Sequence, residues 1–432
     1  MARIVLNTWG SHGDVDPALA LARGLRARGH APVLAAPAFY RDVAAAAGIA
    51  SHAVGPEFDP TDTALVRRIM DRRRGSEVLL RELLLPAVEG AFAELDAAAD
   101  GADLLVSHPA TFAAPVVAES RRLRWASTVL APLSFWSAHD VPVLPPAPWL
   151  KQLEALGPWV GRAIIGASRL ATRGWTAPLD RLRARLGLPR GAHPFFEGQH
   201  APALVLALFS RVLGAPQPDW PAHVVVTGQL LYDAAHGTAL SPALEAFLDA
   251  GPPPVVFTLG TSAVLASGDF FPESLAAARR AGLRAVLMVG RERLAEFASA
   301  NADDAIAIAA APHSQLFPRA AAVVQQCGIG TLGQGLRAGR PMLAVPFAHD
   351  QPDNAYRVTR LGVARTVHPW RYRAARVATA LRALLDDPGY AARAAQVAAQ
   401  VRTEDGVATA CDAIEALLRG EEPPAARAGG AP

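Results

Sequence analysis

Cysteine and long apolar runs are both scarce in this sequence. Its two cysteines, Cys327 and Cys411, lie far apart and lack the spacing of metal ligands, so neither a disulfide framework nor a zinc site is expected. No apolar run approaches the ~18 residues that span a bilayer, and the opening MARIVLNTWG has the pattern of a strand rather than of a signal sequence. These absences predict a cytoplasmic protein.

Lysine is scarcer still, because Lys151 is the only one and the other basic residues are nearly all arginine. The net charge is only +3, which gives no reason to expect nucleic acid as a partner. One basic cluster stands out on a predicted helix: Arg67, Arg68, Arg72, Arg73 and Arg74. Two interpretations stay open for it, a solvated helix face or a peripheral contact with an acceptor or with the anionic inner membrane.

Short apolar runs alternate with helical patterns through the first half of the chain, which is typical of a parallel, doubly wound α/β sheet. The expected strands are residues 3–9, 31–36, 103–107, 127–131, 203–208 and 224–227. The expected helices are residues 15–28, 40–47, 111–121 and a long segment, 63–99, that breaks near Gly75 and Pro86.

The chain has 432 residues, more than one ordinary core holds, so we expect two domains. A second alternating series has its expected strands at residues 255–259, 285–289, 305–309, 320–324 and 342–345, and the pattern after residue 372 is helical. We therefore place an N-terminal domain at 1–230, a linker at 231–254, a second domain at 255–418 and a disordered tail at 419–432.

The segment LSFWSAHDVPVLPPAPW, residues 133–149, has too many prolines and aromatic residues for a regular helix or strand. A long loop with exposed Phe135, Trp136 and Trp149 would give an apolar wall for a ligand. The alternative for Trp136 and Trp149 is an ordinary place in the core.

The stretch from Ala311 to Asn354 has the features of a phosphate-binding site. An apolar strand runs into a glycine-bearing turn at residues 327–330, and a helix opens at Thr331. Backbone N–H groups and the helix dipole favour an anion at such a turn, and glycine lets it approach closely. The polar loop 348–354 would reach the same edge of the sheet. No G-x-G-x-x-G follows either domain's first strand, which disfavours a dinucleotide-dependent oxidoreductase.

Four motifs together resemble those of family 1 glycosyltransferases with the two-domain GT-B fold. They are GSHGDVDP at residues 10–17, the aromatic loop at 130–149, FTLGTS at 257–262 and the stretch 311–354. The bacterial branch that includes rhamnosyltransferases of the rhamnolipid-forming type looks most similar, and the resemblance covers essentially the whole chain. It implies an α/β fold of two doubly wound, Rossmann-like domains whose parallel sheets face each other across a cleft, with a helical C-terminus.

The resemblance also implies the reaction. It is an inverting, metal-independent transfer of a hexose or deoxyhexose, such as rhamnose or glucose, from a UDP- or dTDP-sugar to a hydroxyl of a lipophilic acceptor. No cofactor besides this co-substrate is implied. Asp14 stands where the family has its general base, which takes the proton of the acceptor hydroxyl. From the residues alone, Asp14 fits a helix N-cap. Asp14 and Asp16 also superficially match the D-x-D metal motif of another glycosyltransferase class, but the resemblance to a GT-B chain disfavours metal binding at this place.

The C-terminal domain is implied to hold the donor, with Gly328 to Thr331 at the diphosphate, Ala311 to His313 at the base, and Asp350 and Gln351 at the sugar hydroxyls. The full set of donor residues is Gly10, Ser11, Thr261, Ser262, Ala311, His313, Gln325, Gln326, Cys327, Gly328, Ile329, Gly330, Thr331, Gln334, Asp350 and Gln351. We expect Cys327 to be a small buried residue rather than a reactive thiol.

The N-terminal domain is implied to hold the acceptor. Its expected contacts are His12, His108, Phe135, Trp136, His139, Asp140 and Trp149. His139 and Asp140 are also reserve candidates for the base. For His12 the alternative is a solvated loop residue, and for His108 it is a structural role.

The main departure from the family is a pair of amides before the glycine turn. Gln325 and Gln326 stand where the family usually has histidine, and a glutamine can donate a hydrogen bond to phosphate but cannot carry charge. Ala310 also replaces the aromatic ring that many relatives place against the base. These departures motivate a second hypothesis, a nucleotide-binding auxiliary protein of the same fold with weak or no catalysis. A nucleotide-sugar epimerase is a third, less supported hypothesis, because it gives the acceptor-side loop no purpose.

Overall fold

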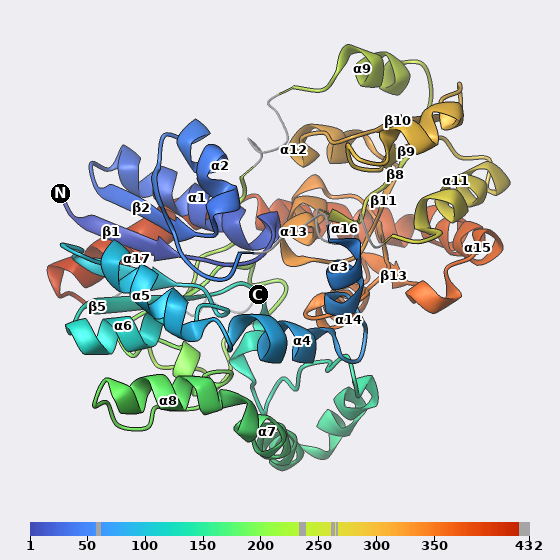
Figure 1. The fold of residues 1–432 in the computed structure, drawn as a ribbon. Coiled ribbons are helices and arrows are strands. Elements are labelled where there is room, and N and C mark those ends of the chain that lie inside the picture. Colours follow the sequence, from blue (N-terminus) through green and yellow to red (C-terminus); the bar gives the residue numbers. More distant parts are fainter. Residues whose placement is uncertain (58–61, 233–238, 261–263, 265–266, 423–432) are drawn as a thin grey trace. The chain divides into compact units, whose positions relative to one another are not determined.

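The computed structural model describes residues 1–57, 62–232, 239–260, 264 and 267–422. The chain forms two compact units, each assembled from separated stretches (Figure 1). The first unit comprises Met1–Asp59, Ser76–Leu230 and Glu404–Pro432, and the second comprises Pro60–Gly75 and Leu231–Thr403. The predicted tail 419–432 lies mostly outside the described residues.

The first unit contains a seven-stranded sheet in the order β3-β2-β1-β4-β5-β6-β7. Every neighbouring pair is parallel, as expected from the alternating pattern. The strands are β1 Arg3–Asn7, β2 Ala31–Ala36, β3 Ala50–Ala53, β4 Leu104–Ser107, β5 Arg124–Val129, β6 Val205–Ala207 and β7 Val224–Val226. The sequence did not predict β3, because its residues ASHA are all exposed at the sheet edge and lack an apolar pattern.

Helices cover both faces of this sheet, with α1 and α2 on one side and α5, α6 and α8 on the other (Figure 1). The helices of the first unit are α1 His12–Ala27, α2 Arg41–Ala46, α4 Gly75–Val78, α5 Val88–Ala98, α6 Ala114–Arg121, α7 Pro158–Thr172, α8 Ala177–Arg185 and α17 Gly406–Arg419, with a π-helix at Leu79–Leu84 and a 3₁₀ segment, η4, at Pro148–Leu156. The core between the sheet and α5 and α6 is aliphatic and includes Val5, Val33, Leu95, Leu105 and Val117. The predicted break of segment 63–99 near Gly75 and Pro86 is confirmed.

The second unit contains a six-stranded parallel sheet in the order β10-β9-β8-β11-β12-β13. Its strands are β8 Val255–Phe257, β9 Ala285–Met288, β10 Ala305–Ile308, β11 Ala322–Gln325, β12 Met342–Ala344 and β13 Ala364–Thr366. Its helices are α3 Thr63–Ile69, α9 Pro242–Asp249, α11 Phe270–Arg280, α12 His313–Leu316, α13 Ile329–Ala338, α14 Gln351–Arg360, α15 Ala374–Leu385 and α16 Pro388–Val401. Two Rossmann-like sheets with helical crossovers are the α/β arrangement that the sequence predicts.

The units differ from the predicted domains at two places. The last helix, α17, belongs to the first unit because it packs along α1, where a Cβ on Gly24 would lie 2.5 Å from Val407 Cγ1. Arg28 on the turn after α1 also pairs with Asp412 and Glu415, at 2.5 and 3.1 Å. The stretch Pro60–Gly75, which includes α3, belongs to the second unit, where the guanidinium of Arg72 lies 4.4 Å from the ring centroid of Trp370.

Candidate functional site

The turn between β1 and α1 holds Asp14 in a capping box. Ser11 is the N-cap, and its side chain accepts from the N–H of Gly13 at 3.3 Å. In return, Oδ2 of Asp14 accepts from the Ser11 N–H at 2.8 Å and from its hydroxyl at 3.1 Å. Asp14 therefore is part of an N-cap, as one reading of the sequence expected, yet its second oxygen, Oδ1, remains available for another group.

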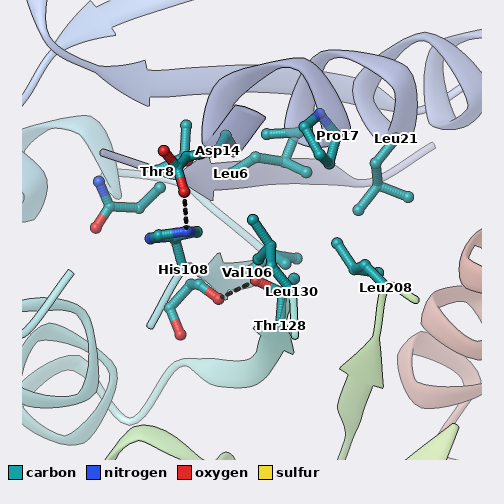
Figure 2. Close-up of a pocket in the computed structure, with 13 residues that line it drawn as sticks. Leu6, Thr8, Asp14, Pro17, Leu21, Val106, His108, Thr128, Leu130 and Leu208 are labelled. Carbon is teal, nitrogen blue, oxygen red and sulfur yellow. Dashed lines mark hydrogen bonds and ion pairs between the residues drawn. The ribbon is translucent and has the colours of Figure 1, made fainter. Parts of the chain in front are cut away.

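That second oxygen faces His108. Ser107 at the end of β4 pairs with Asn7 at the end of β1, so the loops after these adjacent parallel strands meet at one edge of the sheet. Nε2 of His108 lies 3.4 Å from Oδ1 of Asp14 (Figure 2). Nδ1 of the same ring accepts from the Ala110 N–H at 3.1 Å, which assigns the ring proton to Nε2, toward the carboxylate.

This environment keeps Asp14 ionised. Burial by itself raises the pKa of the Asp14 carboxyl, but the hydrogen bond and charge of His108 and the two hydrogen bonds from Ser11 outweigh it, so the net pKa lies below the ordinary value of 3.8. The side chain is 32% exposed, so a ligand can reach it. An ionised, reachable carboxylate is what a general base requires.

A cavity of about 20 Å³, room for about one water molecule, lies beside this pair. Figure 2 shows it between Asp14 and His108 on its polar side and leucine side chains on the other. Its lining residues are Leu6, Asn7, Thr8, Asp14, Pro17, Ala18, Leu21, Val106, Ser107, His108, Thr128, Leu130 and Leu208.

His12 lies near Asp14 in sequence but makes a different contact. Its Nδ1 is 3.1 Å from Oδ1 of Asp16, and its ring meets the edge of Tyr40 with 5.5 Å between the ring centroids. Tyr40 in turn donates to the carbonyl of Gly10 at 2.9 Å. Asp16 is thus paired with a histidine, and the described residues contain no cluster of three His, Cys, Asp or Glu side chains that could hold a metal ion.

The aromatic loop is less exposed than the sequence predicts. Phe135 is 5% exposed and stacks on Trp220, with 3.9 Å between ring centroids, so the prediction that it is exposed is wrong. Trp136 is half-buried and packs against Phe196 at 4.6 Å, within an apolar cluster that also contains Trp9 and Leu179. Trp149 is 59% exposed and is the member of this loop that a ligand can cover.

His139 and Asp140 are held inside the same loop. Oδ1 of Asp140 lies 3.0 Å from Nζ of Lys151, and Lys151, which is buried, also contacts Glu154 at 2.6 Å. The backbone N–H of His139 donates to the hydroxyl of Ser137 at 3.0 Å. The only lysine of the chain therefore has a structural role, and Asp140 is held by the ammonium group of this lysine.

In the second unit, the turn after β11 leads into a helix as predicted, but α13 begins at Ile329, two residues before the predicted Thr331. Cys327 has a φ of +66°, which is uncommon for a residue with a side chain, and Gly328 is the N-cap of α13 without a side-chain cap. The first helical bond runs from the Leu332 N–H to the Gly328 carbonyl, so the N–H groups of Gly330 and Thr331 precede the helical ladder. Ile329 is the first residue of α13, and N–H groups that precede the helical ladder favour an anion at a helix N-terminus. Cys327 is fully buried, and burial followed by the Asp350 charge raises the pKa of its thiol, as expected for a structural residue.

The two glutamines before this turn point to different places. Gln325 is the last residue of β11, and its Nε2 donates to Sδ of Met342 at 3.1 Å inside the sheet. Gln326 lies over the turn, where a Cβ on Gly260 would be 2.3 Å from its Nε2 and a Cβ on Gly328 would be 3.1 Å away. Within the described part of the chain, Oε1 of Gln326 has no hydrogen-bond partner. Gln326, and not Gln325, therefore occupies the position beside the glycine turn.

The polar loop after β12 is tied to the glycine turn by Asn354, which the sequence analysis did not single out. Nδ2 of Asn354 donates to the Cys327 carbonyl at 3.0 Å and to Oδ2 of Asp350 at 2.7 Å. Oε1 of Gln351 accepts from the Phe347 N–H at 2.9 Å, which holds this side chain against the loop after β12. Asn354 lies one helical turn after Asp350, the N-cap of α14, and this spacing is the sequence signal that could have identified it.

The remaining predicted donor residues are spread over the same unit. Ala311 is buried before α12, and the ring of His313 stacks on Phe317 at 4.5 Å. Gln334 is buried on α13, one turn after Gly330. Thr261 and Ser262 lie outside the described residues. Gly10 and Ser11 belong to the first unit, where the contacts seen are those that hold Asp14.

The cluster Arg67–Arg74 is only partly helical, because α3 ends at Ile69. Oδ1 of Asp71 accepts from the N–H groups of Arg73 and Arg74 at 2.9 and 2.7 Å, and Arg72 lies over Trp370. Contact of this cluster with a membrane stays a prediction. No helix among the described residues combines the length and apolar character needed to cross a bilayer.

Comparison with known proteins matches the whole chain. O-mycaminosyltylonolide 6-deoxyallosyltransferase from Streptomyces fradiae is 33% identical over 96% of this chain and 97% of its own. Vancomycin aglycone glucosyltransferase from Amycolatopsis orientalis is 30% identical over 98% of this chain and 99% of its own. Residues 286–417 match the family described as the erythromycin biosynthesis protein CIII-like C-terminal domain.

Solved structures show the same fold. The glycotransferase of kitacinnamycin superposes with a TM-score of 0.70 at 22% identity, covering 96% of this chain and 98% of that one. Spinosyn rhamnosyltransferase SpnG complexed with thymidine diphosphate superposes with a TM-score of 0.63 at 19% identity, covering 95% of this chain and 99% of that one. Together with the 33% identity to a curated sugar transferase along the whole chain, the fold and the two strand-end sites show that this protein is a hexosyltransferase of the family 1 glycosyltransferases with the GT-B fold.

Proposed function

We propose that this enzyme transfers a hexose or deoxyhexose from a UDP- or dTDP-sugar to a hydroxyl of a lipophilic small molecule, with inversion and without a metal, and that it works in the cytoplasm. The observation that carries the proposal is the carboxylate of Asp14, which Ser11 orients at one oxygen and His108 at the other. The relatives support the acceptor class, since their names describe a tylonolide derivative and the vancomycin aglycone.

The proposed reaction is a direct displacement. The acceptor hydroxyl gives its proton to Asp14 while its oxygen forms a bond to the anomeric carbon of the sugar. The bond between that carbon and the phosphate oxygen breaks, and the nucleoside diphosphate leaves with the electron pair. The helix N-terminus at Gly330 and Thr331 meets the growing charge on the leaving group with fixed dipoles. His108 stabilises the ionised form of Asp14 and fixes its direction.

The second candidate is an auxiliary protein of the same fold that binds nucleotide with weak or no catalysis. One observation favours it: the neutral amide of Gln326 stands at the glycine turn, where a histidine could carry charge. A hydrogen bond from a neutral donor stabilises a leaving diphosphate by roughly 1 kcal/mol less than one from a charged donor. This loss slows transfer without abolishing it.

The first experiment is a thermal-shift screen against UDP, dTDP and their sugars, followed by an assay of nucleoside diphosphate release with a panel of lipophilic acceptors. A ligand at 100 times its Kd stabilises the folded protein by about 2.7 kcal/mol, which is readily seen. We expect Asp14→Asn to keep the nucleotide shift and to lose about 10²- to 10⁴-fold in turnover.

The two candidates give different results in this assay. Full turnover by Asp14→Asn would show that another group is the base. If nucleotide binds but neither the wild type nor Gln326→His consumes any donor, the auxiliary protein is the correct assignment. The anomeric configuration of the product, read by NMR, tests inversion, and turnover in excess EDTA tests independence from metal.

A further inference from the structure

Helix α7 has two apolar faces, and only one of them is used inside the protein. Val160 and Ile164 are buried against Val141, and Gly161 is so close to the loop that a Cβ there would lie 2.3 Å from the Ala138 carbonyl oxygen. This contact fixes the helix firmly to the first unit. The opposite face is therefore not needed to attach α7 to the core of the first unit.

The outer face carries large apolar side chains in solvent. Trp159 is 65% exposed and Leu170 is 73% exposed, and the exposed Ala163 and Gly166 lie between them on the same face of a helix with about 3.6 residues per turn. Leu156, 59% exposed, is adjacent, because the indole N–H of Trp159 donates to its carbonyl at 2.9 Å. We call Leu156, Trp159, Ala163, Gly166 and Leu170 the α7 stripe.

The charged residues within the α7 segment itself all have one sign. Residues 155–177 contain no aspartate or glutamate, and their charged residues are Arg162, Arg169 and Arg173. Within the described part of the chain, neither Arg162 nor Arg173 has a carboxylate partner, whereas Arg169 pairs with Glu197 at 2.7 Å.

A hollow of about 310 Å³ opens beside Leu170, at the C-terminal end of the stripe. Arg169, Arg173 and Arg190 line it together with His193. Asp180 is the acidic residue of the lining, and it is already paired with Arg190 at 3.2 Å. The hollow is therefore cationic on balance and is large enough for a phosphate group.

We propose that the α7 stripe and its flanking arginines dock this enzyme on an anionic phospholipid surface. Tryptophan and leucine enter the boundary between headgroups and acyl chains, and the arginines remain at the level of the phosphates. A second copy of the same face fits poorly, because it would bring Arg162 and Arg173, which have no carboxylate partner among the described residues, against the same arginines of the other copy. This proposed docking surface consists of residues of α7 and its flanking arginines, and it does not include the Arg67–Arg74 cluster, whose contact with a membrane stays a separate prediction.

The test is co-sedimentation of the full-length protein with vesicles of phosphatidylglycerol and phosphatidylcholine in equal parts, against vesicles of phosphatidylcholine alone, at low salt. We expect binding to the anionic vesicles only, reversed by salt. Trp159→Ser with Leu170→Ser should lower the partition coefficient by about tenfold or more, since both lose their apolar insertion. Arg162→Gln with Arg173→Gln should lower it by a comparable factor.

The matched control is Arg67→Gln with Arg73→Gln, which removes the same charge from the other cluster and should bind like the wild type. All variants should keep the wild-type Tm and, with a water-soluble acceptor, the wild-type turnover. Absence of wild-type binding, equal binding to both vesicle types, or loss of binding only in the control would overturn the proposal. A wild-type dimer that Trp159→Ser with Leu170→Ser converts to a monomer would assign the stripe to a second copy instead.

Discussion

Nε2 of His108 lies 3.4 Å from Oδ1 of Asp14, with the ring proton directed at the carboxylate by the backbone of Ala110. The histidine therefore supports the proposed base from the loop after a neighbouring strand. Its effect on Asp14 opposes that of burial, and this opposition has a measurable consequence in the pH dependence of transfer.

In His108→Ala, burial of Asp14 is opposed only by Ser11, so the pKa of the carboxyl rises. The acid limb of kcat/KM should move to higher pH, and turnover at neutral pH should fall by about tenfold as the carboxylate loses its orientation. In the wild type the depressed pKa means that the ionised carboxylate of Asp14 contributes its stability above pH 3.8, the ordinary value, and loses it as the pH falls through the lower folded value. A pH profile identical to the wild type would show that His108 does not act on Asp14.

Gly10 is needed at the turn before Asp14 for two reasons. Its φ is +137°, and an added Cβ would lie 2.3 Å from Oδ2 of Asp14. We expect Gly10→Ala to displace the carboxylate, lowering kcat by at least about tenfold, and to cost about 1–3 kcal/mol of unfolding free energy through backbone strain.

Substitutions at two other glycines serve as controls that separate backbone strain from displacement of the Asp14 carboxylate. At Gly29, φ is +83° but no atom lies within 4 Å of the added Cβ, so Gly29→Ala reports strain alone. At Gly13 the nearest atom is Ser11 Oγ at 3.5 Å, an ordinary contact, so Gly13→Ala should be close to neutral. If Gly10→Ala loses stability as Gly29→Ala does but keeps its kcat, the position of Asp14 does not limit the reaction.

Gln325 and Gln326 should respond differently to histidine. In Gln326→His, a ring beside the glycine turn can carry charge, so the affinity for UDP or dTDP should rise by about fivefold at pH 6 and less at pH 8. In Gln325→His, the ring must fit a fully buried place against Met342 and Gly335, so we expect a loss of about 1–3 kcal/mol in stability without tighter binding. Titration calorimetry and urea unfolding measure the two effects. Tighter nucleotide binding by Gln325→His would reverse the assignment.

Substitution of Asn354 should lower both the stability of the protein and its affinity for the donor. Asn354→Ala leaves the Cys327 carbonyl without its side-chain donor and removes one hydrogen bond of Asp350, so we expect a loss of about 1–3 kcal/mol and a raised KM for the donor with the acceptor KM unchanged. Asn301→Ala is the control, because Asn301 also bonds the backbone through its side chain, here as an acceptor: its Oδ1 accepts from the Ala307 N–H at 2.7 Å, in the segment before β10. Equal donor KM values in both variants would show that the hydrogen bonds of Asn354 to Cys327 and Asp350 do not affect donor binding.

The sequence predicted the strands and helices that are determined by residues close together in the chain. Apolar runs bounded by glycine and proline located β1, β8 and β11, and the glycine after Cys327 located the N-terminus of α13. The edge strands β3 and β13 escaped prediction because they have too few buried side chains to produce a pattern.

What depends on distant partners could not be predicted from the residues around it. The buried place of Phe135 follows from its stacking on Trp220, and nothing near Phe135 in the chain indicates that partner. The same holds for the difference between Gln325 and Gln326, which depends on Met342 and Gly260. The contact of His108 with Asp14 required the strand order, in which β4 lies directly beside β1.

The return of α17 to the first unit has a consequence for anyone who wishes to exchange sugar specificity by recombining genes. A single crossover placed near residue 231 would give the first unit a foreign last helix, and Gly24, Arg28 and His30 would meet side chains they were not selected to fit. Such a chimera needs two junctions, one near Leu230 and one near Glu404, so that the stretch Leu231–Thr403 of the second unit is inserted between two parts of the first unit.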